Sequence, residues 1–165
     1  MLFLPYLIGE RSPHWNPRAR GAFVGLSTVH GRKEMARAVL EGVAFHLRLI
    51  LDAFREQGAS PAAIRLIGGG ARSALWRQIL ADVFNLPILR PRLLAEATSL
   101  GAAIAGGVGV GLYADYGVAS TLVQVDPGEE PRAEAVARYE VFYPLFRQAY
   151  RALAPVYEGI ADAVS

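Results

Sequence analysis

Three consecutive glycines, Gly68–Gly70, lie between the apolar segment 64–67 and a stretch whose apolar residues return at helical spacing from Leu75 onward. Glycine loses more backbone freedom on folding than any other residue, so this run indicates a tight turn, a close helix–strand contact or a ligand against bare backbone. A strand passing into a helix at this point would offer free N–H groups and the positive end of the helix dipole. Ser73 is placed to cap that helix. Local spacing alone leaves both close packing and nucleotide contact open at this turn.

The same alternation of strand and helix patterns extends along the chain. The apolar spacing predicts, in order, a strand at 21–26, a helix at 32–58, a strand at 64–67, a helix at 75–84, a strand at 88–89, a helix from about 95–96 and a helical segment at 132–164. Alternation of this kind is typical of an α/β fold with parallel strands. Because three short strands make a thin sheet, we expect the domain to be incomplete on its N-terminal side.

Proline and glycine divide the chain into regions. Pro144 and Pro155 interrupt the last helical segment, where we expect kinks. The predicted regions are a Pro- and Arg-rich loop at 1–20, an α/β core at 21–113 and a helical tail at 131–165.

Composition narrows the class of protein. The 165 residues are 53% hydrophobic, which suffices for a core, and their net charge of +2 is too small to indicate nucleic-acid binding. The absence of cysteine excludes disulfides, thiolate metal ligands and a cysteine nucleophile, and it fits a cytoplasmic protein. The apolar stretches are too short or too rich in glycine and proline for a membrane-spanning helix, which needs about 20 residues. We therefore expect a cytoplasmic protein that binds neither nucleic acid nor membrane.

The glycine runs match no complete phosphate-binding fingerprint. Gly68–Gly70 is not followed by the Gly-Lys-Ser/Thr of a Walker A loop, and the third glycine of the dinucleotide-binding motif is missing. The second glycine-rich run, 106–111, follows a helix instead of a strand, so it is interpreted as a C-cap and loop.

The titratable residues favour structural roles. The histidines lack the spacing of metal ligands or of a catalytic triad, and the carboxylates fall on or near predicted helices. The arginines of the first loop either contact phosphate or acidic groups or are simply exposed to solvent, and their charge alone favours exposure. These groups are His14, His30 and His46; Asp52, Asp82 and Glu96; and Arg11, Arg18 and Arg20. The sequence thus predicts no catalytic residue and no metal ligand within the chain.

Four motifs follow one another in a fixed order: FLPYLIGERSPHWNPRARGAFVGL at 3–26, RAVLEGVAFHLR at 37–48, IGGGARSALWRQILADVF at 67–84 and EATSLGAA at 96–103. Together they resemble the C-terminal domain of the FGGY carbohydrate kinases, and most closely its xylulokinases. The resemblance covers about residues 3–155, so it is far more specific than any one glycine run.

The resemblance implies a partial actin-like, ribonuclease-H-like ATPase domain with a helical C-terminal tail. It implies an ATP-dependent kinase that transfers the γ-phosphoryl group of Mg-ATP to a sugar hydroxyl, that of D-xylulose first, with gluconate or another sugar or polyol as alternatives. ATP and the Mg²⁺ that it carries would be the cofactors. The glycine turn would lie against the adenosine part of ATP through Gly68, Gly69, Gly70 and Ser73, with Gly69 and Ser73 in the most direct contact.

The sequence also departs from the family pattern. The resemblance implies a first domain that holds the sugar-binding residues and the general-base aspartate, and neither has a counterpart here. We therefore expect a truncated C-terminal part that is inactive alone, meets the sugar only through the missing domain, and self-associates or forms a homodimer. A non-catalytic nucleotide-binding or interaction module is the alternative.

Overall fold

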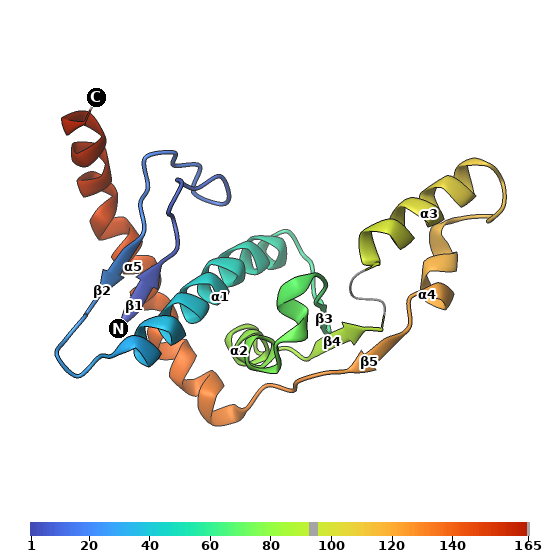
Figure 1. The fold of residues 1–165 in the computed structure, drawn as a ribbon, viewed down its shortest axis with the longest axis horizontal. Helices are drawn as coiled ribbons and strands as arrows, with labels where there is room; N and C mark the ends of the chain where they lie inside the picture. Colours follow the sequence, from blue (N-terminus) through green and yellow to red (C-terminus); the bar gives the residue numbers. More distant parts are fainter. Residues whose placement is uncertain (93–95, 165) are drawn as a thin grey trace. The chain divides into compact units, whose positions relative to one another are not determined.

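The computed structural model describes residues 1–92 and 96–164, which form two compact units. Unit 1 comprises Met1–Ser60, Asp82–Asn85 and Arg132–Ser165, and unit 2 comprises Pro61–Ala81 and Leu86–Pro131. Figure 1 labels their helices and strands along the chain. Ala95, one of the two residues at which the sequence predicted the start of a third helix, lies outside the described residues.

In unit 1, strand β1 (Leu2–Leu4) pairs antiparallel with β2 (Ala22–Val24). β1 lies against both long helices of the unit, α1 (Arg32–Glu56) and α5 (Ala133–Ala163). The sequence analysis assigned residues 2–4 to a loop and expected parallel strands, and both predictions are wrong for this pair. Gly21 and Gly25 mark the bounds of β2 in the sequence, whereas residues 2–4 run on into Pro5 and the loop without such a boundary.

β1 can approach α1 closely because Gly42 has no side chain. A Cβ atom at Gly42 would collide with the backbone oxygen of Phe3. Half of the residues that α1 buries are small: the buried residues are Ala38, Gly42, Ala44, Phe45, Leu49 and Leu51. The apolar residues whose spacing predicted this helix are mostly half-buried, and Phe54 keeps 60% of its surface exposed.

Aromatic side chains join α1 to α5. The ring of Phe45 on α1 contacts those of Tyr139, Tyr143 and Phe146 on α5, with centroids 5.6, 6.0 and 5.5 Å apart. α5 is a single helix with both of its prolines inside it, as the sequence predicted for a helical tail. These rings and the fully buried Leu4 form the core of unit 1.

Asp82, which is fully buried, holds the N-terminus of α5. Its Oδ1 accepts a hydrogen bond from the backbone N–H of Arg132 at 2.8 Å, and its Oδ2 accepts one from the Arg132 guanidinium at 2.6 Å. The first free N–H groups of a helix need such acceptors. The structural role predicted for Asp82 is therefore confirmed.

In unit 2, β4 (Ile88–Pro91) is the middle strand of a three-stranded sheet. It pairs in parallel with β3 (Ile64–Arg65), as predicted, and antiparallel with β5 (Val125–Pro127), which the sequence analysis missed. Aspartate and proline are depleted in strands, so the sequence Val-Asp-Pro gives no strand signal. The 3₁₀ turn η1 (Gly69–Arg72) and helix α2 (Ala74–Phe84) connect β3 to β4, and the last residues of α2 belong to unit 1.

The rest of unit 2 contains α3 (Ala97–Gly109), the 3₁₀ turn η2 (Tyr116–Val118) and the short helix α4 (Ala119–Leu122). The interpretation of 106–111 as a C-cap and loop is wrong for most of the run, because α3 continues to Gly109. Gly111, with φ +77°, is the glycine of this run that takes the left-handed conformation.

Helices and a mixed sheet together make the chain an α/β protein. None of the helices within the described ranges is long and apolar enough to span a membrane.

Candidate functional site

The glycine turn follows β3 directly and leads into α2. Gly68 takes φ +83°, a left-handed conformation that side chains disfavour. Its carbonyl accepts a hydrogen bond from the N–H of Ala71 at 3.1 Å, and the carbonyl of Gly70 accepts one from Ser73 at 3.1 Å. These bonds, each between residues three apart, make residues 69–72 the 3₁₀ helix η1, which precedes α2.

Ser73 caps α2. Its Oγ accepts a hydrogen bond from the backbone N–H of Trp76 at 3.2 Å, and its own backbone is extended. An N-cap oxygen bonded to the N–H three residues ahead is the expected capping geometry. The predicted N-cap is confirmed.

The three glycines differ in their surroundings. A Cβ atom at Gly68 or Gly69 would meet nothing within 4 Å, whereas at Gly70 it would lie 3.1 Å from Cδ1 and Nε1 of the Trp76 indole. Close packing against Trp76 therefore accounts for Gly70. The left-handed backbone of Gly68 requires a glycine there, whereas no contact within the described part of the chain accounts for Gly69. Around both residues the backbone is open, because nothing lies within 4 Å of the place of a Cβ atom.

Behind the turn lies an ion pair that the sequence analysis did not predict. Arg77 on α2 is 7% exposed and binds both carboxylate oxygens of Glu129, through Nε at 2.6 Å and Nη2 at 2.7 Å. Its Nη1 donates to the carbonyl of Ala71 in η1 at 2.6 Å. The hydrogen bonds to Glu129 raise the pKa of Arg77, so its charge is permanent. The partners stand 52 residues apart, and no local pattern connects them.

Unit 2 also contains an apolar cavity of about 580 Å³, one wall of which is Ile67, the residue before Gly68. Its walls come from the ends of β3 and β4 and from α3, η2 and α4. The lining includes Ile67, Pro91, Leu100, Ile104, Tyr116 and Leu122, with Arg65, Arg92 and Gln124 as polar groups. A mostly apolar cavity with a few polar groups is typical of small-molecule sites.

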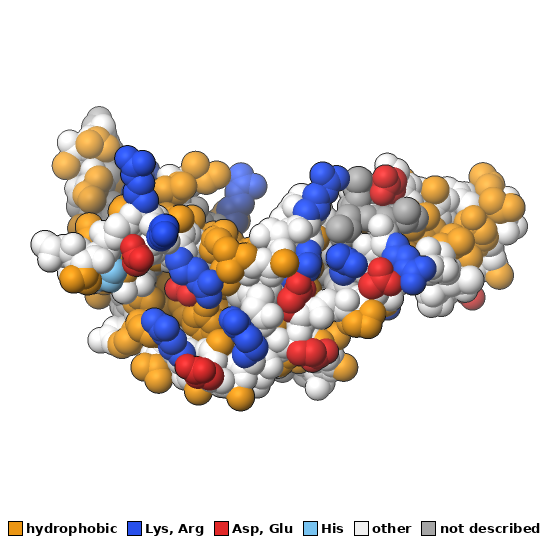
Figure 2. All heavy atoms as spheres, turned by 60° about the horizontal axis from the view of Figure 1, so that its bottom comes forward, with side chains coloured by type: hydrophobic (Ala, Val, Ile, Leu, Met, Phe, Trp, Pro, Cys, Tyr) orange, Lys and Arg blue, Asp and Glu red, His pale blue; other side chains and the backbone are white. Residues whose placement is uncertain are grey.

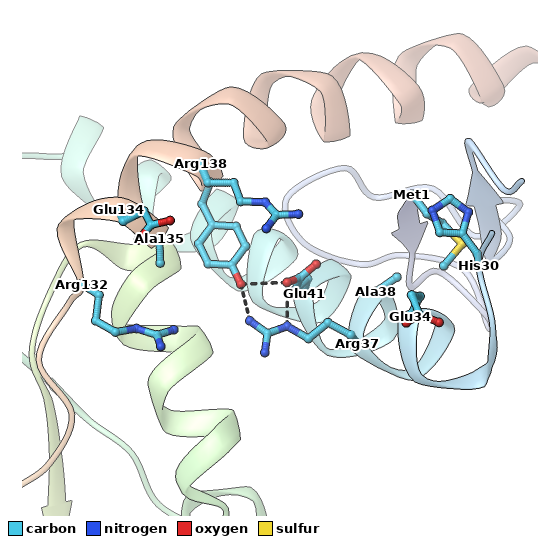
Figure 3. A pocket seen from close by; sticks show the side chains of 11 residues that line it. Met1, His30, Glu34, Arg37, Ala38, Glu41, Arg132, Glu134, Ala135 and Arg138 are labelled. Atoms are coloured by element: carbon cyan, nitrogen blue, oxygen red, sulfur yellow. Dashed lines mark hydrogen bonds and ion pairs between the residues drawn. The ribbon is translucent and has the colours of Figure 1, made fainter.

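A second cavity, of about 600 Å³, lies in unit 1 between α1 and the start of α5 (Figure 3). Arg37 donates to Glu41 at 2.7 Å and to the hydroxyl of Tyr139 at 2.7 Å, and that hydroxyl donates to Glu41 at 2.8 Å. Burial raises the pKa of Tyr139 to about 12, so it stays protonated near neutral pH. The carboxylate of Asp82 pairs with Arg132, another residue of the lining. Neighbouring carboxylates thus neutralise two of the arginines, and we assign this cavity no ligand.

Two of the three histidines, His14 and His46, contact the same tyrosine in unit 1. The ring of Tyr6 contacts those of His14 and His46 with centroids 6.1 and 5.4 Å apart, and Nε2 of His46 lies 3.3 Å from Glu10. Burial lowers the pKa of both histidines, and Glu10 partly opposes the effect. Sequence spacing could not bring these rings together. Within residues 1–92 and 96–164, no group of three or more His, Cys, Asp or Glu side chains could hold a metal ion.

Three of the remaining candidates are engaged within the chain. Asp52 accepts hydrogen bonds from Arg55 at 3.2 Å and from the hydroxyl of Tyr143 at 2.6 Å, which is a structural role. Arg18 pairs with Glu158 and Asp162 at 2.8 Å each. Glu96 directly precedes α3 and its carbonyl accepts the N–H of Leu100, so it stands just before the first turn in which it was predicted. Lys and Arg are interspersed with Asp and Glu over the face drawn in Figure 2.

The fold and the glycine turn together indicate the class of protein to which the chain belongs. Residues 1–110 match the FGGY family of carbohydrate kinases, C-terminal domain, and the chain belongs to that family. It is 39% identical to a gluconokinase of Bacillus licheniformis over 98% of its length, and 38% identical to a xylulose kinase of Staphylococcus epidermidis over 92%. The crystal structure of a ligand-bound xylulose kinase from Lactobacillus acidophilus matches 96% of the chain with a TM-score of 0.89 and 36% identity.

These relatives are much longer proteins. The chain spans 32% of the gluconokinase, 30% of the xylulose kinase and 32% of the crystallised xylulose kinase. The predicted family and its partial actin-like α/β fold are therefore confirmed for a segment that corresponds to about a third of each relative.

Proposed function

We propose that this chain supplies the ATP-binding part of a cytoplasmic carbohydrate kinase. The observation that carries the proposal is the open backbone of Gly68 and Gly69, at the start of the turn that leads through η1 into α2 and next to the apolar cavity that Ile67 borders. Apolar walls suit a purine base, and N–H groups at a helix N-terminus suit ribose or phosphate oxygens. In this proposal the ligand is Mg-ATP, whose phosphates carry the Mg²⁺.

The four predicted site residues take different parts in the proposal. Gly68 and Gly69 admit the nucleotide against bare backbone, because nothing within 4 Å occupies the place of their side chains. Ser73 contacts it with the hydroxyl that also caps α2. Gly70 contributes through its main chain alone, since Trp76 already explains its missing side chain.

The proposed reaction is transfer of the γ-phosphoryl group to a hydroxyl of D-xylulose, with gluconate or another sugar or polyol as the alternative acceptor. The hydroxyl oxygen bonds to phosphorus while the bond to ADP breaks, and the proton of the hydroxyl passes to a base. Relatives named gluconokinase and xylulose kinase match at 39% and 38% identity, so identity does not separate the two sugars. We propose that a further domain provides the base and the sugar site, and that this chain alone is inactive.

Isothermal titration of the chain with Mg-ADP and Mg-ATP tests the nucleotide site. We expect Gly69→Ala to weaken binding about tenfold, because a methyl group would hold the nucleotide away from the backbone. The melting temperature should not fall, since that methyl group meets no atom of the chain within 4 Å. Gly159→Ala on α5, also with open space around it, is the matched control and should bind like the wild type. Equal affinities of both variants, or no wild-type binding at millimolar nucleotide, would overturn the proposal.

An assay of ATP consumption against a sugar panel tests the reaction. It is run with this chain alone and with the N-terminal part of a xylulose kinase or gluconokinase added. We expect turnover only in the mixture, with D-xylulose first. Turnover by the chain alone would contradict the proposal that a further domain provides the base and the sugar site. Nucleotide binding without turnover in any mixture would favour the non-catalytic nucleotide-binding module.

A further inference from the structure

All three nitrogens of the Arg77 guanidinium donate hydrogen bonds, and they share two acceptor groups. Nε and Nη2 bind the carboxylate of Glu129 side by side, and Nη1 donates to the carbonyl of Ala71. The side chains of Arg77 and Glu129 are 9% and 17% exposed, so water competes little for these bonds. Paired N–H···O bonds of this kind fix the guanidinium in one plane as well as in one place.

The contact with Ala71 connects this ion pair to the open glycines. The carbonyl of Ala71 accepts from Arg77, and its N–H donates to the carbonyl of Gly68 at 3.1 Å. A continuous series of hydrogen bonds thus runs from Glu129 through Arg77 and Ala71 to Gly68. Next to Arg77 on α2, Gln78 donates to the carbonyl of Glu130 at 2.9 Å, which ties the same helix to the same segment.

We propose that Arg77 is the positioning residue of the nucleotide site: held by Glu129, it fixes the backbone of residues 68–73 in the shape that receives the ligand. The inference rests on the proposed function, because it assigns a supporting residue to that same site. Arg77 stands behind the turn and acts through Ala71.

Lysine cannot replace arginine in this role. Its single ammonium is a point charge without the planar fork that spans two carboxylate oxygens and a carbonyl at once. Arg77→Lys keeps the charge and much of the packing, so its effect reports the lost geometry. Glu129→Gln keeps Arg77 but removes the charge that orients it. This variant tests the inference if Arg77→Lys does not fold.

Arg48 on α1 provides a matched control. Its side chain is 12% exposed, and it donates to the carbonyl of Val83 at 3.1 Å and pairs with Glu140 at 2.8 Å. It thus makes the same kinds of bond as Arg77, to a carbonyl and a carboxylate, within unit 1. Arg48→Lys should lower stability without changing the glycine turn.

Two measurements on the full chain test the inference. The first is hydrogen exchange of residues 68–73 without ligand, which we expect Arg77→Lys and Glu129→Gln to accelerate and Arg48→Lys to leave unchanged. The second is calorimetric affinity for Mg-ADP well below the melting temperature, which Arg77→Lys should weaken about tenfold. Glu129→Gln should weaken it less, and Arg48→Lys should not weaken it.

The outcomes separate this inference from the proposed function. If the wild type does not bind Mg-ADP but exchange in the turn responds to Arg77→Lys, the proposed function fails while the positioning of the turn stands. If the wild type binds and Arg77→Lys changes neither exchange nor affinity more than Arg48→Lys does, Arg77 is a stability residue and the inference is overturned.

Discussion

At the scale of single residues, unit 1 packs two half-buried histidines against one tyrosine ring. His14 and His46 both contact Tyr6, and His14 also stacks on Tyr150 with ring centroids 3.9 Å apart. The aromatic contacts hold the loop that carries His14 against α1 and α5. An imidazole in this setting packs well when neutral and poorly when charged.

Acid should therefore destabilise the chain through these histidines. Burial lowers the pKa of both, and for His14 the charges of His46, Arg147 and Arg151 act in the same direction while Glu10 opposes them. The unfolded chain then binds more protons below pH about 6.5, so stability falls as the pH drops through the folded-state pKa values.

Urea unfolding midpoints between pH about 7.5 and 5 measure this dependence. The double variant His14→Gln with His46→Gln should flatten it, whereas His30→Gln, a change at the histidine that hydrogen-bonds to Ser27, should retain the wild-type slope. An unchanged slope in the double variant would contradict the assignment.

At the scale of elements, the start of α5 depends on one buried carboxylate. Asp82 accepts the backbone N–H and the guanidinium of Arg132 and is fully buried. We expect Asp82→Ala to lower the free energy of unfolding by about 3 kcal/mol, because it leaves a helix terminus without its acceptor and removes a buried partner. Asp82→Asn should lower it less, since the amide oxygen still accepts the N–H.

Denaturant unfolding checks this prediction, with Asp126→Ala on β5 as the control. Asp126 pairs with Arg92 at 2.8 Å, but the side chains are 32% and 60% exposed, so its loss should cost less than about 1 kcal/mol. Equal losses for Asp82→Ala and Asp126→Ala would show that Asp82 does not anchor α5.

The sequence predicted the elements whose patterns are long or chemically distinct. The spacing of apolar residues located α1, α2 and α5, and Ser73 marked the start of α2. β1 and β5 were missed, because β1 runs on into the proline-rich loop and the Val-Asp-Pro of β5 carries no strand signal. At the glycine turn the sequence left close packing and nucleotide contact open. It did not predict the ion pair behind the turn, because Arg77 and Glu129 are brought together only by the folded sheet.

At the scale of the whole molecule, large apolar side chains remain exposed on both units. Unit 1 exposes 97% of Ile8 and 81% of Val29, and unit 2 exposes 82% of Val110 and 70% of Leu112. Hydrophobic surface lies among the charged side chains of the face drawn in Figure 2. Exposed apolar patches favour association with a partner or with further copies.

We expect the isolated chain to self-associate, with a sedimentation coefficient that rises with concentration. One double variant in each unit shows which unit carries the contact, because charges placed in the contact should reduce the rise of the sedimentation coefficient with concentration. The two variants are Ile8→Lys with Val29→Lys in unit 1 and Val110→Lys with Leu112→Lys in unit 2. Ile160→Lys on α5, where 48% of the side chain is exposed, is a control for added charge. A single monomeric species at every concentration would contradict the prediction.

The division of unit 1 into separate stretches of sequence has a consequence for synthesis on the ribosome. Residues 1–60 are synthesised before α5, but their core needs the aromatic side chains of α5 and the pairing of Asp82 with Arg132. Translation proceeds at about 5–20 residues per second, so the nascent chain carries α1 without its partner for seconds. Unit 2 lies entirely within residues 61–131 and can form its sheet during that interval. Unit 1 is thus completed only after unit 2 has been synthesised, and a pause before residue 132 leaves Phe45 without its contacts to α5.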